Sequence, residues 1–86
     1  MNVGDVKATV RQGLRAVDTG RRTIEAVAAE TADATSRAGY AVYDSSHPEI
    51  DEAMTCLREA AREVELTNRR IEATTEAAHE FLKALG

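Results

Sequence analysis

The sequence predicts an all-α protein that folds as one long antiparallel two-helix hairpin of the coiled-coil type. Apolar or small residues recur at alternating intervals of three and four residues along almost the whole chain, which is the spacing of one helix face. The only proline, Pro48, follows a short run of turn-forming residues near the middle. The chain has no tryptophan and 3% aromatic residues, which argues against a β-sandwich or barrel.

With 86 residues, the chain is long enough for one small domain, which we expect to span residues 1–86. The first helix is predicted over residues 3–43. Two sets of residues, each spaced by seven, are predicted to face the second helix. The first set is Val3, Val10, Val17, Ile24, Thr31 and Ala38, and the second is Val6, Gly13, Gly20, Val27, Ala34 and Ala41.

Three glycines lie beyond the first turn of this predicted helix. Gly13 and Gly20 each weaken a helix interior by about 0.5–1 kcal/mol relative to alanine. One explanation is that they admit a closely approaching partner helix and so specify register or oligomeric state; the other is a kink near Gly20. Gly39 is interpreted either as a helix C-cap or as a residue inside the helix.

The turn is predicted at residues 44–46 and the second helix at residues 47–85. Ser46 and Glu49 have the spacing of a capping box, in which each side chain satisfies a backbone N–H of the other residue. Pro48 suits the first helical turn, where its missing N–H has no cost. Acidic residues directly after it favour the positive end of the helix dipole.

The second helix repeats the apolar pattern without interruption to the end of the chain. The residues are Ile50, Met54, Leu57, Ala61, Val64, Asn68, Ile71, Thr75, Ala78, Leu82 and Leu85. Folding the chain back at the turn sets Ala38 opposite Met54 and Gly20 opposite Ile71, so that small residues meet large ones. Asn68 is the one strongly polar member of the series. It is expected to specify register and oligomeric state, or else to leave a hydrated gap opposite Ile24.

Further small and apolar residues widen this stripe beyond a two-helix contact. On the second helix they are Ala53, Ala60, Thr67, Thr74 and Phe81, and on the first helix Leu14, Ala28, Thr35 and Val42. These edges predict a second interface, most simply a homodimer that forms a four-helix bundle. The alternative is an elongated monomer with an alanine-rich surface.

Two of the three aromatic residues, Tyr40 and Tyr43, flank Val42 at the expected tip of the hairpin. Such a cluster either caps the hairpin core or forms a partner-binding tip, since aromatic residues carry a large share of contact energy.

Few residues suggest chemistry. Glu76 and His79 have the Glu-x-x-His spacing of ferritin-like metal sites, but an exposed charged pair is the simpler interpretation, and the two are weak metal candidates. His47 is expected in a solvated loop. Cys56 is expected as an exposed thiol, with an intersubunit disulfide as the alternative. No catalytic residues and no cofactor are predicted.

Charge and hydropathy exclude several classes of function. The net charge of −4 disfavours nucleic acid as a partner. No run of 18 apolar residues is present, so no membrane span is expected, and the N-terminus lacks the pattern of a signal peptide. The single cysteine, Cys56, is typical of a reducing compartment. We therefore expect a cytoplasmic protein, with export by a signal-peptide-independent system as a possibility.

Two family resemblances involve the turn and the residues beside it. The segment Ser-Ser-His-Pro-Glu-Ile-Asp-Glu-Ala at 45–53, with the Leu-Arg-Glu-Ala-Ala-Arg-Glu helix at 57–63, resembles short actinobacterial helical proteins of unknown function. That resemblance implies an adaptor or secretion role, because similar segments precede toxin-like domains. In length and shape the chain also resembles the ESX-type WXG secreted hairpins. Tyr40 and Asp44 have the spacing of their export signal, although they precede the turn and the Trp-x-Gly turn is absent.

Together these features predict a non-enzymatic helical interaction, scaffolding or adaptor module that acts through self-association and an unidentified protein partner. The alternatives are an ESX-like secreted hairpin or toxin-associated escort protein and, more remotely, a ferritin-like metal-binding hairpin.

Overall fold

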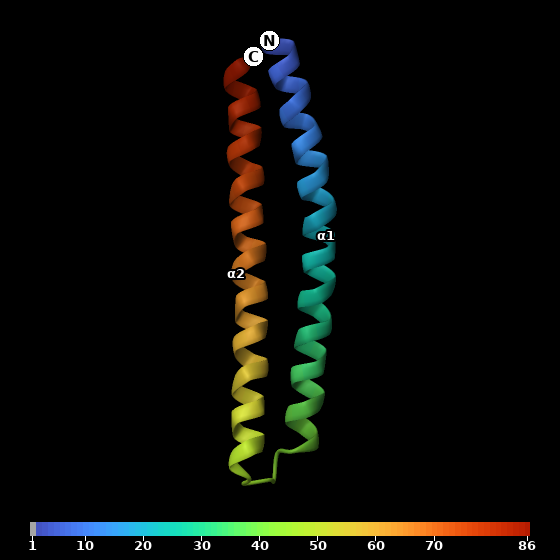
Figure 1. The fold of residues 1–86 in the computed structure, drawn as a ribbon, viewed down its shortest axis with the longest axis vertical. Coiled ribbons are helices and arrows are strands. Elements are labelled where there is room, and N and C mark those ends of the chain that lie inside the picture. Colours follow the sequence, from blue (N-terminus) through green and yellow to red (C-terminus); the bar gives the residue numbers. More distant parts are fainter. Residues whose placement is uncertain (1) are drawn as a thin grey trace.

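Two long antiparallel helices make up almost all of the structure, a computed structural model that describes residues 2–86. Helix α1 spans Val3–Ala41 and helix α2 spans Pro48–Leu85. They lie side by side along their whole length, with both chain ends at one end of the molecule and the connection at the other (Figure 1). The hairpin measures 63 × 16 × 15 Å. The prediction of an all-α helical hairpin is confirmed.

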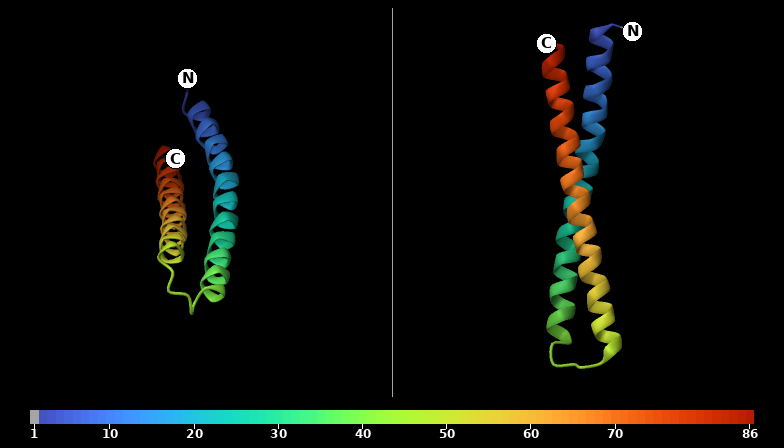
Figure 2. Two further views of the ribbon diagram at one scale, coloured as in Figure 1. Left: turned by 60° about the horizontal axis from the view of Figure 1, so that its bottom comes forward. Right: turned by 90° about the vertical axis from the view of Figure 1, so that its left-hand side faces the viewer.

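Helix α1 runs without a break through Gly13, Gly20 and Gly39. It ends two residues before the predicted boundary, and residues 42–47 form the connection. At its end the Val42 N–H donates to the Ala38 carbonyl at 3.2 Å, and the Ser45 N–H donates to the Val42 carbonyl at 2.9 Å. Figure 2 shows that α1 bends gently along α2 and that the two helices cross at mid-length, as expected of helices that keep a seven-residue contact pattern.

The predicted capping box at the start of α2 is wrong. The N-cap residue is His47, which makes no side-chain cap hydrogen bond, and Pro48 occupies the first turn as expected. Because the helix begins one residue later than a Ser46 cap requires, Glu49 is at the second helical position and cannot close the box. Its carboxylate instead lies 2.6 Å from the His47 Nδ1.

A capping box is present at the start of α1. The Asn2 side-chain oxygen accepts from the Asp5 N–H at 2.9 Å, and the Asn2 N–H donates to the Asp5 carboxylate at 3.4 Å. The sequence signal was an Asn and an acidic residue three positions apart. It was missed because Asp5 takes the place of the usual Glu or Gln.

The faces that the helices turn toward each other are only partly those predicted. All eleven predicted residues of α2 are half-buried, as expected. On α1 the first predicted set is half-buried from Val10 to Ala38, but Val3 is 52% exposed. The second set is wrong by one residue beyond Val6. Its remaining members are exposed, and the half-buried residues are those one position later: Leu14, Arg21, Ala28, Thr35 and Val42.

Side-chain size favours this one-residue displacement near both ends of the series, whereas in its middle the smaller Ala28 is half-buried and Val27 is exposed. Leu14 and Val42 bring more apolar area between the helices than Gly13 and Ala41 do, and burial stabilises roughly in proportion to that area. We call the half-buried series on each helix its contact stripe. On α1 it comprises Val6, Val10, Leu14, Val17, Arg21, Ile24, Ala28, Thr31, Thr35, Ala38 and Val42. On α2 it is the series from Ile50 to Leu85 that the sequence predicts.

The helices approach closely at Gly39. A methyl group at this position would lie 3.4 Å from the Met54 Cε, whereas at Gly13 and Gly20 it would meet no atom within 4 Å. The predicted register sets Ala38 opposite Met54, and this contact lies one residue further along α1. At the other end, the Lys7 Nζ donates to the Gly86 carbonyl, which joins the first turns of α1 to the last residue of the chain.

No side chain is buried among residues 2–86. The hairpin exposes 6499 Å², whereas a compact monomer of its 9.3 kDa mass exposes about 5,000 Å². Each helix therefore covers one stripe of its surface and leaves the other sides open.

The two cap assignments can be tested by substitution. Asn2→Ala should lower the free energy of unfolding by about 0.5–1 kcal/mol, because it removes the acceptor of the α1 capping box. Ser46→Ala, the matched change at the predicted but absent cap, should leave it within about 0.5 kcal/mol of the wild type. Urea unfolding followed by circular dichroism measures both, and a loss confined to Ser46→Ala would contradict the observed caps.

Candidate functional site

The tip of the hairpin presents two exposed aromatic rings. Tyr40 is 82% exposed and Tyr43 is 80% exposed, and their ring centroids lie 6.2 Å apart at an interplanar angle of 35°. Val42 between them is half-buried at the end of the α1 contact stripe. The three predicted tip residues thus separate: Val42 closes the contact between the helices, and the two tyrosines do not cap it.

The tip also carries a concentrated negative charge. Between Arg37 and Arg58 the chain has no lysine or arginine. The same segment holds four carboxylates, those of Asp44, Glu49, Asp51 and Glu52. Since the remaining eleven acidic residues balance the eleven basic ones, this segment accounts for the whole net charge of −4. The spacing of the basic residues along the sequence reveals this feature.

His47 contributes to the electrostatics of the tip. The hydrogen bond from its ring lowers the pKa of the Glu49 carboxyl, with a smaller contribution from the Glu49 backbone N–H. Glu49 therefore remains ionised to lower pH than an ordinary glutamate, which maintains the negative charge of the tip.

One side of the shaft is charged. Asp18, Arg21, Glu72, Thr75 and His79 line a shallow groove between α1 and α2. We call the side of the hairpin on which this groove opens the charged flank. On α1 it includes the residue directly after Val17 and after each contact-stripe residue spaced from Val17 by multiples of seven, such as Asp18. On α2 it includes the residue directly after Ile71 and after each contact-stripe residue spaced from Ile71 by multiples of seven, such as Glu72 and His79.

Ion pairs within α1 fix the positions of the charged side chains that α1 contributes to this groove. The Arg21 guanidinium lies 2.6 Å from Asp18 and 2.8 Å from Glu25, and Arg22 lies 3.0 Å from Asp18. The hydrogen bond from Arg21 lowers the pKa of the Asp18 carboxyl, and the same bond raises the pKa of Arg21. On α2, Arg69 pairs with Glu65 at 2.7 Å. Acidic neighbours on the same helix thus neutralise Arg21, Arg22 and Arg69.

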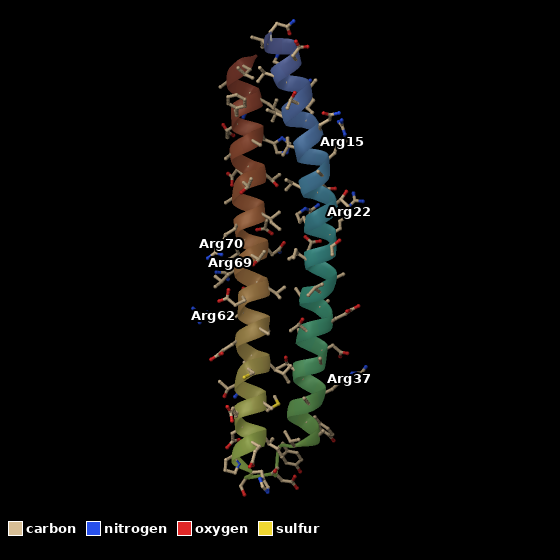
Figure 3. The ribbon with its side chains drawn as sticks, viewed as in Figure 1. Arg15, Arg22, Arg37, Arg62, Arg69 and Arg70 are labelled. Carbon is tan, nitrogen blue, oxygen red and sulfur yellow. The ribbon has the colours of Figure 1, made fainter. Side chains whose placement is uncertain are left out.

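The arginines labelled in Figure 3 point outward, away from the contact between the helices. Arg15, Arg22 and Arg37 extend from the outer edge of α1, and Arg62, Arg69 and Arg70 from the outer edge of α2. Arg22 therefore does not form one cationic site with Arg69 and Arg70.

The weak metal candidates Glu76 and His79 both line the charged groove. Asp18 of the facing helix lies in the same groove, a carboxylate that sequence reasoning did not place there, but it is already bound by two guanidinium groups. Among residues 2–86 no three His, Cys, Asp or Glu side chains are arranged to share a metal ion.

Asn68 lies in the α2 contact stripe, where the sequence placed it. Its side-chain oxygen is buried and has no hydrogen-bond partner within the part of the chain that the structure describes. A buried acceptor without a partner destabilises a fold by about 1–3 kcal/mol. Asn68 is thus a candidate for a residue that specifies register or oligomeric state at the expense of stability.

The side of the hairpin opposite the charged flank carries no charge at its ten central positions. Successive residues of a helix are about 100° apart around its axis. The residue directly before Leu14 on α1 or Met54 on α2, and before each contact-stripe residue of the same helix spaced from it by multiples of seven, therefore projects away from the charged flank. On α1 these residues are Gly13, Gly20, Val27, Ala34 and Ala41. On α2 they are Ala53, Ala60, Thr67, Thr74 and Phe81. We call this surface the uncharged flank.

The uncharged flank contains all five of the second-interface residues predicted on α2. The four predicted on α1 are wrong, because they lie half-buried in the contact stripe between the helices: Leu14, Ala28, Thr35 and Val42. Val27 and Phe81 are the large members of the uncharged flank, 40% and 47% exposed. The reduced thiol of Cys56 is also exposed.

None of the described helices is sufficiently long and apolar to cross a membrane. Comparison of the chain with family models, with curated protein sequences and with solved structures found no match.

Replacing Asn68 tests its role. Asn68→Leu should raise the free energy of unfolding by about 1 kcal/mol, because it removes a buried acceptor without a partner, and it should broaden the distribution of oligomeric states. Thermal unfolding and sedimentation velocity measure the two effects. Asn68→Ala is the control that removes the amide without adding volume. A loss of several kcal/mol in both variants would show that Asn68 stabilises the hairpin.

Proposed function

We propose that this chain is a helical interaction module without enzymatic chemistry, which self-associates and holds a protein partner as a scaffold or adaptor. The observation that carries the proposal is the absence of any buried side chain among residues 2–86. A hairpin with one contact stripe per helix has little apolar burial to offset the conformational entropy of ordering its chain. Association with a second hairpin supplies the missing burial in the form of a four-helix bundle.

The tip supports the second half of the proposal. Tyrosine side chains provide a large contact area with few rotatable bonds, and for this reason they are frequent among the residues that dominate binding energy. Within residues 38–57, which include Tyr40 and Tyr43, the only formal charges are negative. The partner that suits this surface presents lysine or arginine, which pairs with the carboxylates and stacks on the rings.

Coupling between folding and association has a direct consequence for stability. The midpoint of thermal unfolding, Tm, should rise by several degrees between about 5 and 200 µM protein, because dilution favours the dissociated chains. Circular dichroism measures Tm and sedimentation equilibrium measures mass at the same concentrations. A constant Tm together with a monomeric mass would contradict self-association.

The tip is tested by removing both rings. The double variant Tyr40→Ala, Tyr43→Ala should keep the helicity and oligomeric state of the wild type, since both side chains are exposed, and should no longer retain the partner that wild-type protein captures from its host. The control is Ala8→Ser with Thr9→Ala, which changes exposed positions of the same helix at the end opposite the tip. Equal capture by the tyrosine variant and the control would remove the tip from the proposal.

A further inference from the structure

Gly13 and Gly20 have no function within the single hairpin. A methyl group at either position would meet no atom within 4 Å, so the facing helix does not require glycine there. Each glycine nevertheless weakens α1 by about 0.5–1 kcal/mol relative to alanine. The two lie seven residues apart on the uncharged flank, which is the repeat at which a long helix meets a neighbouring helix along one side.

The uncharged flank is large enough for a stable interface. Its positions run from residue 13 to 41 on α1 and from 53 to 81 on α2, about 42 Å of helix. With the 16 Å width of the hairpin, this gives an outline of about 700 Å², close to the roughly 800 Å² per partner of a standard-size complex. The surface that the hairpin exposes in excess of a compact monomer, about 1,500 Å² per chain, is of the same order. Covering this one flank would therefore remove about half of the excess.

The two flanks differ in what their burial requires. On the charged flank, a partner would have to remove water from Asp18, Arg21, Glu72 and His79, at a cost that ion pairing often fails to recover. On the uncharged flank, the ten central positions include no charged side chain. Two large residues, Val27 and Phe81, stand among glycine, alanine and threonine, and this mixture of large and small residues allows two such surfaces to interdigitate.

We propose that the uncharged flank is the surface on which a second copy of this chain docks, with its own uncharged flank, to form a two-fold symmetric four-helix bundle. The inference rests on the proposed self-association and specifies its surface. In such an interface every residue occurs twice, so Gly13 and Gly20 of each copy leave space for the large residues of the other. The charged flanks and both tips then remain in solvent, free for other partners.

A matched pair of substitutions tests this assignment. Ala34 and Ala32 are both exposed alanines of α1; Ala34 lies on the uncharged flank, whereas Ala32 follows Thr31 and lies on the charged flank. Ala34→Glu should weaken dimerisation about 100-fold, because it places two unpaired carboxylates in one symmetric interface. Ala32→Glu should leave the dissociation constant within about threefold of the wild type. Sedimentation equilibrium measures the constant, and circular dichroism verifies the helicity.

A second variant distinguishes a loss of dimerisation from a loss of folding. Gly20→Glu raises the helix propensity of α1 and should still dissociate the dimer, with Ala26→Glu on the outer side of the same helix as its control. A dimer that survives both Ala34→Glu and Gly20→Glu, or that Ala32→Glu weakens equally, would overturn the inference and leave self-association intact. A monomeric wild type at about 200 µM would overturn self-association itself, and would indicate that a different protein covers this flank.

Discussion

The contact stripe between α1 and α2 is the constraint on which the rest of this structure depends. Nearly every other stabilising interaction in the described chain is made within one helix or at its ends: the backbone hydrogen bonds, the capping box of Asn2, and ion pairs such as Arg21 with Asp18. Interactions of that kind stabilise an isolated helix only marginally. The spacing of fours and threes along both helices is what keeps one narrow apolar line in contact over 63 Å.

Much of the fold could be predicted from that spacing, and the errors have a common cause. On α2, charged or strongly polar residues interrupt most alternative series, so the stripe from Ile50 to Leu85 is well determined. On α1 two adjacent series are both nearly uncharged, one containing Gly13 and Ala34 and the other containing Leu14 and Thr35. Periodicity cannot distinguish them, since a shift by one residue preserves every interval. The volume available between the helices decides, and that quantity belongs to the packed pair rather than to either sequence segment.

The candidate surfaces were also predicted only in part from the sequence. The sequence predicted the tip tyrosines and the α2 edge from composition alone, because aromatic residues are rare in this chain and small residues are regularly spaced. It did not predict whether Tyr40 and Tyr43 cover the end of the contact stripe, since that depends on the path of residues 42–47, where Val42 turns inward. The position of Asp18 in the groove beside Glu76 and His79 also depends on tertiary register, which fixed intervals along one helix do not report.

Charge is segregated along the hairpin in a way that keeps its surfaces independent. Along the shaft the acidic and basic residues are equal in number, and several are paired three or four residues apart within one helix, so they exert little field at a distance. The net charge is concentrated at the tip instead. Negative tips repel one another, and this repulsion disfavours aggregation of hairpins end to end. A flank free of charge, placed at right angles to such a tip, allows lateral association to proceed while the tip remains open to a partner of opposite charge.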